Sequence, residues 1–135
     1  FMTLFLMVID LNKRELRWVR AGHEPAILYE PESNEFKQLS GEGIALGVDS
    51  DYRFQSTSCH LWKPGSVVVI GTDGIHETRN KEGEMFGRER LQEIIGRHHM
   101  EKAVSLQTAI LEELEAFRGS SIQEDDITLV VVKLL

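Results

Sequence analysis

Two runs of apolar residues constrain the fold more than any other feature of this sequence. Ser66 to Ile70 is almost continuously apolar, and Ile127 to Leu135 is a second such run. A short apolar run without alternation is typical of a strand that is covered on both faces. We therefore expect Ser66 to Ile70 to lie inside a layered domain, and Ile127 to Leu135 to form a final core strand.

The N-terminal part of the chain predicts several further strands. Thr3 to Asp10 and Glu15 to Arg20 flank a polar turn at residues 12–14, which is the pattern of a β-hairpin. Ala26 to Tyr29 and Phe36 to Leu39 are the next expected strands. We expect these four strands to form a meander.

The rest of the chain predicts one more strand and two helices. Tyr52 to Trp62 alternates like a strand, whereas Arg88 to His98 and Glu101 to Phe117 place apolar residues at helical spacing. Strands followed by helices and a last strand favour an antiparallel α+β layered domain over a βαβ repeat. The length of 135 residues and the 41% hydrophobic content fit a single domain over residues 1–135.

Charge and hydropathy exclude several classes of protein. The formal net charge is -7 and the basic residues are scattered, so a nucleic-acid-binding surface is not expected. The apolar stretch from Leu4 to Ile9 is far shorter than the roughly 20 residues that cross a bilayer, and it lacks the features of a signal peptide. We expect a cytoplasmic protein. The single Cys59 cannot form an internal disulfide and is expected to be a small buried residue.

Carboxylates stand where the two apolar runs begin or end. Asp73 follows the first run in a Gly-Thr-Asp-Gly segment, and Asp125 and Asp126 precede the second run. If the two strands pair antiparallel, Asp73 meets one of these two residues, because consecutive residues on an extended chain point opposite ways. Paired carboxylates with water hold Mg²⁺ or Mn²⁺. An Asp-Gly turn and a solvated acidic loop explain the same residues, and the local pattern leaves both open.

Short motifs follow one another along the whole chain: Ala21-Gly22-His23-Glu24-Pro25, Leu46-Gly47-Val48, Pro64-Gly65-Ser66, Thr72-Asp73-Gly74-Ile75-His76-Glu77, Phe86-Gly87-Arg88 and Asp125-Asp126-Ile127-Thr128-Leu129. In this order they resemble the PP2C-type metal-dependent serine/threonine phosphatases, most closely the bacterial SpoIIE/RsbU-like branch. The resemblance covers essentially every residue.

The resemblance implies a fold, a reaction and a set of site residues. The fold would be an αββα sandwich with two Mn²⁺ or Mg²⁺ ions between its sheets, and a metal-bound water would hydrolyse phosphoserine or phosphothreonine without a covalent enzyme intermediate. Asp73 and Asp125 would bind metal. Gly74, Asp126 and Glu77 would support or frame the site.

His23 has two interpretations. An exposed imidazole in a Gly-His-Glu turn could act as a general acid, and it could equally serve to stabilise the turn. We do not assign it as catalytic.

The sequence lacks two motifs that the family carries near the start of the domain. A Gly-Asp-Tyr-Tyr-Asp-like strand and an Asp-Val-Ser-Gly-His-Gly-like turn, which supply a bridging Asp and a backbone carbonyl to the metals, are absent. We expect them to precede residue 1 in a longer protein, so that residues 1–135 form the C-terminal part of the domain and are inactive alone. The alternative is a phosphatase-like regulatory module that binds a partner without hydrolysis.

The resemblance also implies partners. The substrate would be a phosphorylated regulatory protein of the anti-anti-sigma factor type, and the parent chain would carry an N-terminal sensor or receiver domain. Apolar surface left uncovered on residues 1–135 would favour a homodimer.

Overall fold

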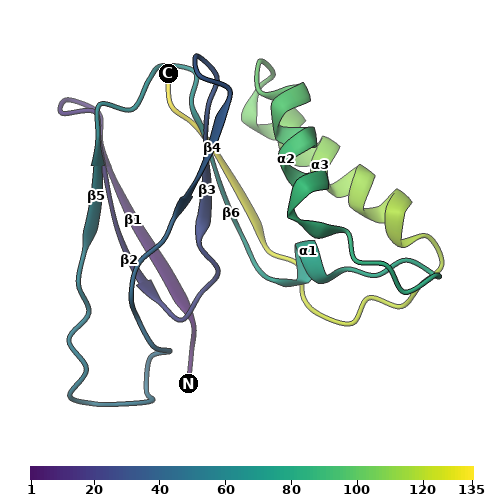
Figure 1. Ribbon diagram of the computed structural model, residues 1–135, viewed down its shortest axis with the longest axis horizontal. Coiled ribbons are helices and arrows are strands. Elements are labelled where there is room, and N and C mark those ends of the chain that lie inside the picture. The colour runs from purple at the N-terminus through teal and green to yellow at the C-terminus, as the bar shows by residue number, and fades with distance from the viewer.

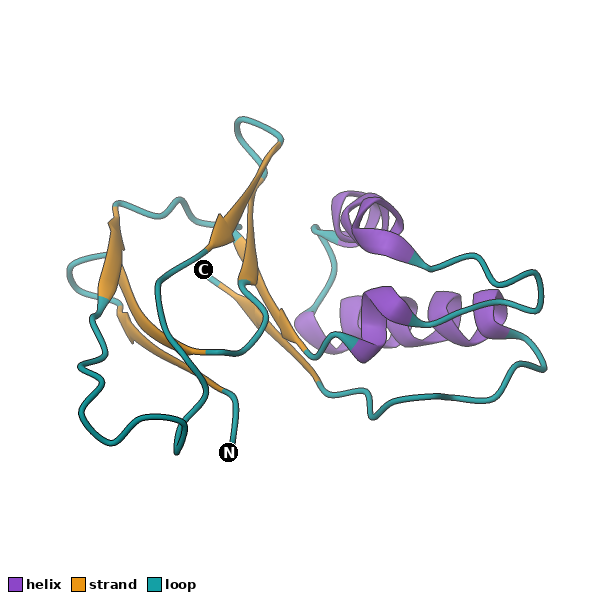
Figure 2. Ribbon diagram, turned by 60° about the horizontal axis from the view of Figure 1, so that its bottom comes forward, coloured by secondary structure: helices purple, strands orange, loops and turns teal.

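The computed structural model describes all residues 1–135, which form two antiparallel β-sheets and a layer of helices (Figure 1). One sheet has the strand order β1-β2-β5 and the other has the order β4-β3-β6-β7. The helices lie beside the second sheet only (Figure 2). The elements are β1 (Leu4–Asp10), β2 (Glu15–Ala21), β3 (Ala26–Glu30), β4 (Glu35–Leu39), β5 (Thr57–His60), β6 (Val67–Gly71), α1 (Gly74–Glu77), α2 (Gly87–His98), α3 (Ala103–Arg118) and β7 (Leu129–Lys133).

The predicted hairpin is confirmed, but the four-stranded meander is wrong. β1 pairs with β2 from Leu4 opposite Ala21 to Asp10 opposite Glu15, whereas β3 and β4 pair in the other sheet. The chain leaves the first sheet at Gly22, whose φ of +68° suits glycine. β2 and β3 then face each other across the gap between the sheets, which buries apolar side chains of both strands.

The strand predicted over Tyr52 to Trp62 is shorter than expected, because only Thr57–His60 pairs with β2. The Tyr52 and Phe54 rings pack against each other at 4.8 Å between centroids in the loop before β5. Cys59 is partly buried against the core between the sheets.

Two apolar clusters hold the three layers together. The cluster between the sheets includes Leu16, Trp18 and Leu28. The cluster between the second sheet and the helices consists of buried side chains from both layers: Ile27, Tyr29, Val67, Val69, Ile75, Phe86, Leu91, Ile94, Ile95, Leu106, Ile110 and Leu114. Residues of β6 alternate between the two clusters, so this strand is covered on both faces as predicted.

β7 is the final strand, as predicted, but it is shorter than Ile127 to Leu135 and less buried than a core strand. It pairs with β6 alone and forms an edge of its sheet, and Val130 is 46% exposed. The two long helices confirm the helical periodicity, whereas α1 was not predicted because a single turn is too short to show one.

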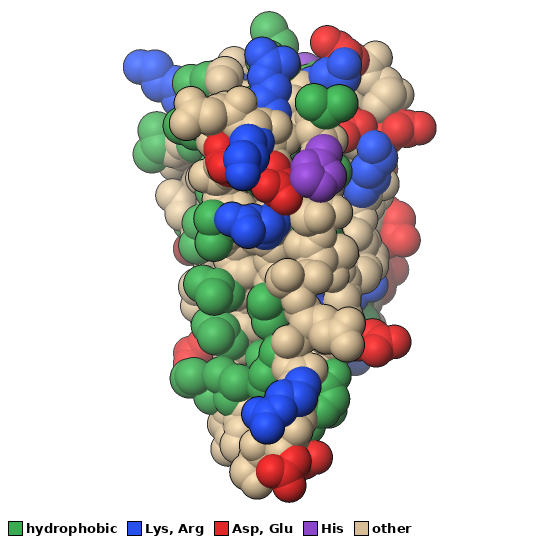
Figure 3. Space-filling model, turned by 90° about the vertical axis from the view of Figure 1, so that its left-hand side faces the viewer, with side chains coloured by type: hydrophobic (Ala, Val, Ile, Leu, Met, Phe, Trp, Pro, Cys, Tyr) green, Lys and Arg blue, Asp and Glu red, His purple; other side chains and the backbone are tan.

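The outer face of the β1-β2-β5 sheet carries no helix in residues 1–135. Leu4, Leu6 and Val8 alternate with core residues along β1 and are 40%, 55% and 49% exposed. Figure 3 views the molecule from this side and shows hydrophobic side chains gathered over the lower part of the face. Residues 1–135 thus form two sheets and one helix layer. These are three of the four layers of an αββα sandwich. None of the helices is long and apolar enough to cross a membrane.

Candidate metal centre

Antiparallel pairing of β6 with β7 brings the two predicted carboxylate segments to the same end of the sheet, where β6 ends and β7 begins. Gly71 lies opposite Leu129, and the Thr72 amide donates to the Thr128 carbonyl at 3.1 Å. The strand that ends before Asp73 and the strand that follows Asp126 therefore meet, as the sequence predicted for an antiparallel pair.

The Thr72 side chain adds two hydrogen bonds to this junction. Its Oγ1 donates to the Asp126 carbonyl at 2.9 Å and accepts from the Thr128 amide at 3.0 Å. These bonds fix the backbone before β7 against the residue that precedes Asp73. The sequence analysis missed this role of Thr72, because a threonine after a core strand gives no sign of its distant partners.

Gly74 allows the two segments to approach each other closely. It is buried, and a Cβ built on it would lie 2.6 Å from the Asp126 carbonyl oxygen. A backbone atom cannot move aside like the end of a flexible side chain, so only glycine fits here. Gly74 therefore supports the site through its lack of a side chain.

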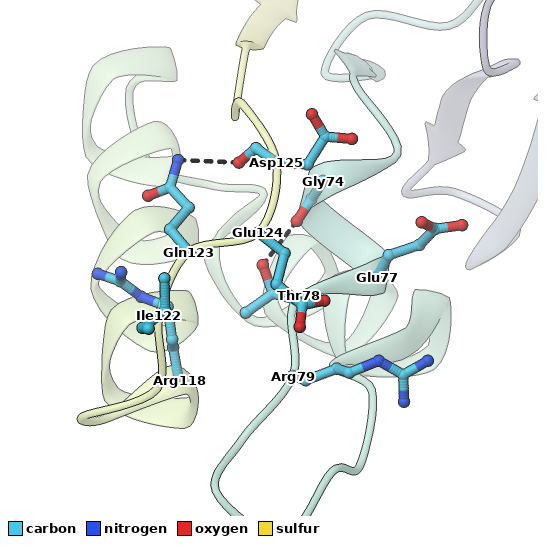
Figure 4. A pocket seen from close by; sticks show the side chains of 9 residues that line it. All are labelled: Gly74, Glu77, Thr78, Arg79, Arg118, Ile122, Gln123, Glu124 and Asp125. Carbon is cyan, nitrogen blue, oxygen red and sulfur yellow. Dashed lines mark hydrogen bonds between the residues drawn. The ribbon is translucent and has the colours of Figure 1, made fainter.

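Asp73 and Asp125 are both exposed, and each uses one carboxylate oxygen locally. Asp73 Oδ1 caps α1 by accepting from the Gly74 amide at 3.0 Å, and Asp125 Oδ1 accepts from the Asp126 amide at 2.8 Å. The second oxygen of each carboxylate makes no hydrogen bond within the protein. Figure 4 shows Asp125 next to Gly74 at the start of α1.

The other predicted site residues take different places. Asp126 contributes its backbone carbonyl to Thr72, and its side chain makes no hydrogen bond. Glu77 is exposed at the end of α1 and lines the same hollow as Asp125.

His23 lies in the turn between β2 and β3. Its Nδ1 is 3.1 Å from the Glu24 carbonyl, and its own carbonyl accepts from Arg20 Nε. No hydrogen bond joins it to Asp73 or Asp125. These contacts match a turn-stabilising role.

The donor set for a metal is partial. The structure contains no group of three or more His, Cys, Asp or Glu side chains arranged to hold a metal ion. Two exposed carboxylates on fixed neighbouring segments fit a hard cation such as Mg²⁺ or Mn²⁺, which prefers oxygen ligands and retains several waters. Asp73 and Asp125 thus fit as part of a metal site and do not complete one.

Two antiparallel sheets packed face to face, with helices outside and carboxylates at the sheet edge, define the architecture of PP2C-type phosphatase domains. The chain is similar to the SiaA-PP2C domain of Pseudomonas aeruginosa, with a TM-score of 0.83 and 23% identity over 97% of this chain and 51% of that chain. It is also similar to the Mn-presoaked phosphatase domain of SpoIIE from Bacillus subtilis, with a TM-score of 0.72 and 22% identity over 98% of this chain and 56% of that one.

The chain belongs to the family described as stage II sporulation protein E (SpoIIE), whose model matches residues 1–135. Among curated proteins, phosphoserine phosphatase RsbU of Bacillus subtilis (strain 168) is 31% identical over 133 residues. That match covers 98% of this chain and 39% of RsbU, so the chain spans less than half the length of this relative.

Proposed function

We propose that the full-length protein is a metal-dependent phosphatase that hydrolyses phosphoserine or phosphothreonine on a regulatory protein of the anti-anti-sigma factor type. The observation that carries the proposal is the junction of Thr72, Gly74 and Asp126, which holds the Asp73 and Asp125 segments side by side. Membership of the SpoIIE family and similarity to a phosphoserine phosphatase support the reaction class.

In this proposal Asp73 and Asp125 bind Mn²⁺ or Mg²⁺ through their free carboxylate oxygens. The bound ions would activate water and neutralise the charge that develops on the phosphoryl group. The protein contributes a fixed arrangement of ligands, because Asp73 is held as a helix cap and Asp125 by the adjacent amide. Asp126 and Glu77 would frame the site without binding the metals.

Two carboxylates are too few for a two-metal centre, so the proposal requires donors from outside residues 1–135. Residues 1–135 would then be one part of a single phosphatase domain and would be inactive when isolated. The parent chain would carry an N-terminal sensor or receiver domain and act in the cytoplasm.

The test is Mn²⁺-dependent release of phosphate from a phosphoserine protein by the full-length protein. We expect Asp73→Asn and Asp125→Asn to lower activity by more than about 100-fold, since a direct ligand matters more than the outer residues whose loss costs roughly 10- to 100-fold. Asp126→Asn is the matched control, because the bond to Thr72 uses its backbone, and it should retain most of the activity. Isolated residues 1–135 should release no phosphate.

A second candidate function is a regulatory module that binds a phosphoprotein without hydrolysis. It would explain the absence of a three-ligand cluster in residues 1–135 without donors from elsewhere. A full-length protein that binds Mn²⁺ poorly and is inactive at every metal concentration would support this alternative and exclude the phosphatase.

We also infer a homodimer of residues 1–135 in isolation. The apolar stripe of Leu4, Leu6 and Val8 is exposed on β1, which is also an edge strand of its sheet. Burial of this stripe against a second copy would remove apolar surface from water and satisfy the open edge.

A further inference from the structure

A hollow of about 250 Å³ opens beside Asp125. One wall is the end of α1 with Thr78 and Arg79, and the other wall is the end of α3 with the segment from Ile122 to Asp125 (Figure 4). Because Asp125 is one of its lining residues, a molecule bound at the candidate metal centre would have part of its surface in this hollow.

Two arginines line the hollow, and only one of them has a partner. Arg79 Nη1 donates to the Gly83 carbonyl at 2.8 Å, which holds the turn that follows α1. Arg118, in the last turn of α3, is partly buried, and its guanidinium makes neither a hydrogen bond nor a salt bridge. A guanidinium offers five donors in a planar fork that matches a carboxylate. Arg118 is therefore a positive group whose hydrogen-bonding capacity is unused.

The position of Arg118 separates it from the reacting phosphoryl group. Figure 4 shows Arg118 beside Ile122 at one end of the hollow and Asp125 beside Gly74 at the other. Gln123 and Glu124 lie between them. An extended chain advances about 3.3 Å per residue, so Ile122 to Asp125 spans up to roughly 10 Å. A side chain bound at this end of the hollow would therefore lie within about three residues of a phosphoserine at Asp73 and Asp125, counted along an extended peptide.

We propose that Arg118 is a specificity-determining residue, which binds an Asp or Glu side chain within about three residues of the phosphoserine of the substrate protein. The proposal rests on the phosphatase function proposed above. The acidic neighbours Glu77 and Glu124 sharpen the selection, since they repel a carboxylate that enters elsewhere in the hollow. A substrate without the acidic residue gains nothing from Arg118.

The experiment compares three substrates of the full-length protein in Mn²⁺: p-nitrophenyl phosphate, a phosphoserine peptide with Glu two and three residues to either side, and the same peptide with Gln at those positions. Arg118→Gln should lower kcat/KM for the Glu peptide by about five- to tenfold, mainly through KM, as expected for one partly exposed charged pair. Activity on the other two substrates should change by less than about twofold. Arg53→Gln is the matched control, because Arg53 is exposed, unpaired and remote from the hollow.

Three results would overturn the proposal. An equal loss on all three substrates would mean that Arg118 contacts the phosphoryl group or supports the fold, and no loss on any substrate would mean that it contacts nothing. Binding of the two peptides, measured by fluorescence anisotropy, separates this proposal from the phosphatase function. If the wild type hydrolyses nothing but binds the Glu peptide more tightly and loses that preference in Arg118→Gln, only the phosphatase function fails. If it neither hydrolyses nor distinguishes the peptides, both fail.

Discussion

The Thr72 hydroxyl donates a hydrogen bond to the Asp126 carbonyl at 2.9 Å, across 54 positions of sequence. The same hydroxyl accepts from the Thr128 amide at 3.0 Å. The Thr72 side chain therefore connects the segment of Asp73 to the segment of Asp125, although Thr72 is not itself a candidate metal ligand. We therefore expect the spacing of the candidate metal ligands to depend on this residue.

Thr72→Val should weaken both the fold and the metal site. Valine has nearly the same shape but removes both hydrogen bonds. Because the junction is exposed and water can replace the lost partner, this should cost about 0.5–1.5 kcal/mol in the free energy of unfolding. Urea denaturation measures this cost, and titration with Mn²⁺ should show weaker metal binding. Thr72→Ser keeps the hydroxyl and should restore most of both, so equal effects of Val and Ser would contradict the role of the hydrogen bonds.

Gly74→Ala should separate the two segments. The new Cβ would lie 2.6 Å from the Asp126 carbonyl oxygen, and forced backbone shifts of this kind cost about 1–3 kcal/mol. Gly96→Ala, inside α2, is the control, because it should raise the free energy of unfolding where Gly74→Ala lowers it. Its Cβ would have Phe36 at 4.0 Å as the nearest atom, so alanine should stabilise the helix by about 0.5–1 kcal/mol. Thermal unfolding of both variants checks these signs.

Asp73 should reveal two separable roles. Its Oδ1 caps α1, and its other oxygen is the candidate metal ligand. Asn preserves a capping oxygen, so Asp73→Asn should lose metal-dependent activity while its stability without metal stays within about 0.5 kcal/mol of the wild type. Asp73→Ala should lose activity and roughly 1 kcal/mol of stability. Denaturation in EDTA, where no metal contributes, compares the three proteins.

The exposed stripe on β1 should make isolated residues 1–135 self-associate. Leu6→Lys places a charge at its centre and should shift sedimentation towards the monomer, because a buried unpaired charge opposes association. Val104→Lys changes a 64% exposed residue on α3, outside the stripe, and should leave association unchanged. A wild-type fragment that sediments as a monomer at all concentrations would rule out the homodimer.

Local patterns in the sequence predicted most of the elements. The apolar run at Val67 to Ile70 predicted β6, and the helical spacing from Arg88 onward predicted α2 and α3, because burial on both faces or on one helix face dictates the pattern. The meander failed for a physical reason. Strand patterns specify which residues are apolar, and they do not specify whether β3 joins the sheet of β2 or packs against it.

The sequence by itself determined that Asp73 follows one apolar run and that Asp125 precedes another, since both facts depend only on neighbouring residues. Whether the two meet was decided by the antiparallel pairing of β6 with β7, a contact between residues far apart in the chain. Only the tertiary structure shows the hydroxyl bond of Thr72, the space that Gly74 must leave empty, and the unpaired guanidinium of Arg118. Each of these is a relation between distant segments, which no local pattern contains.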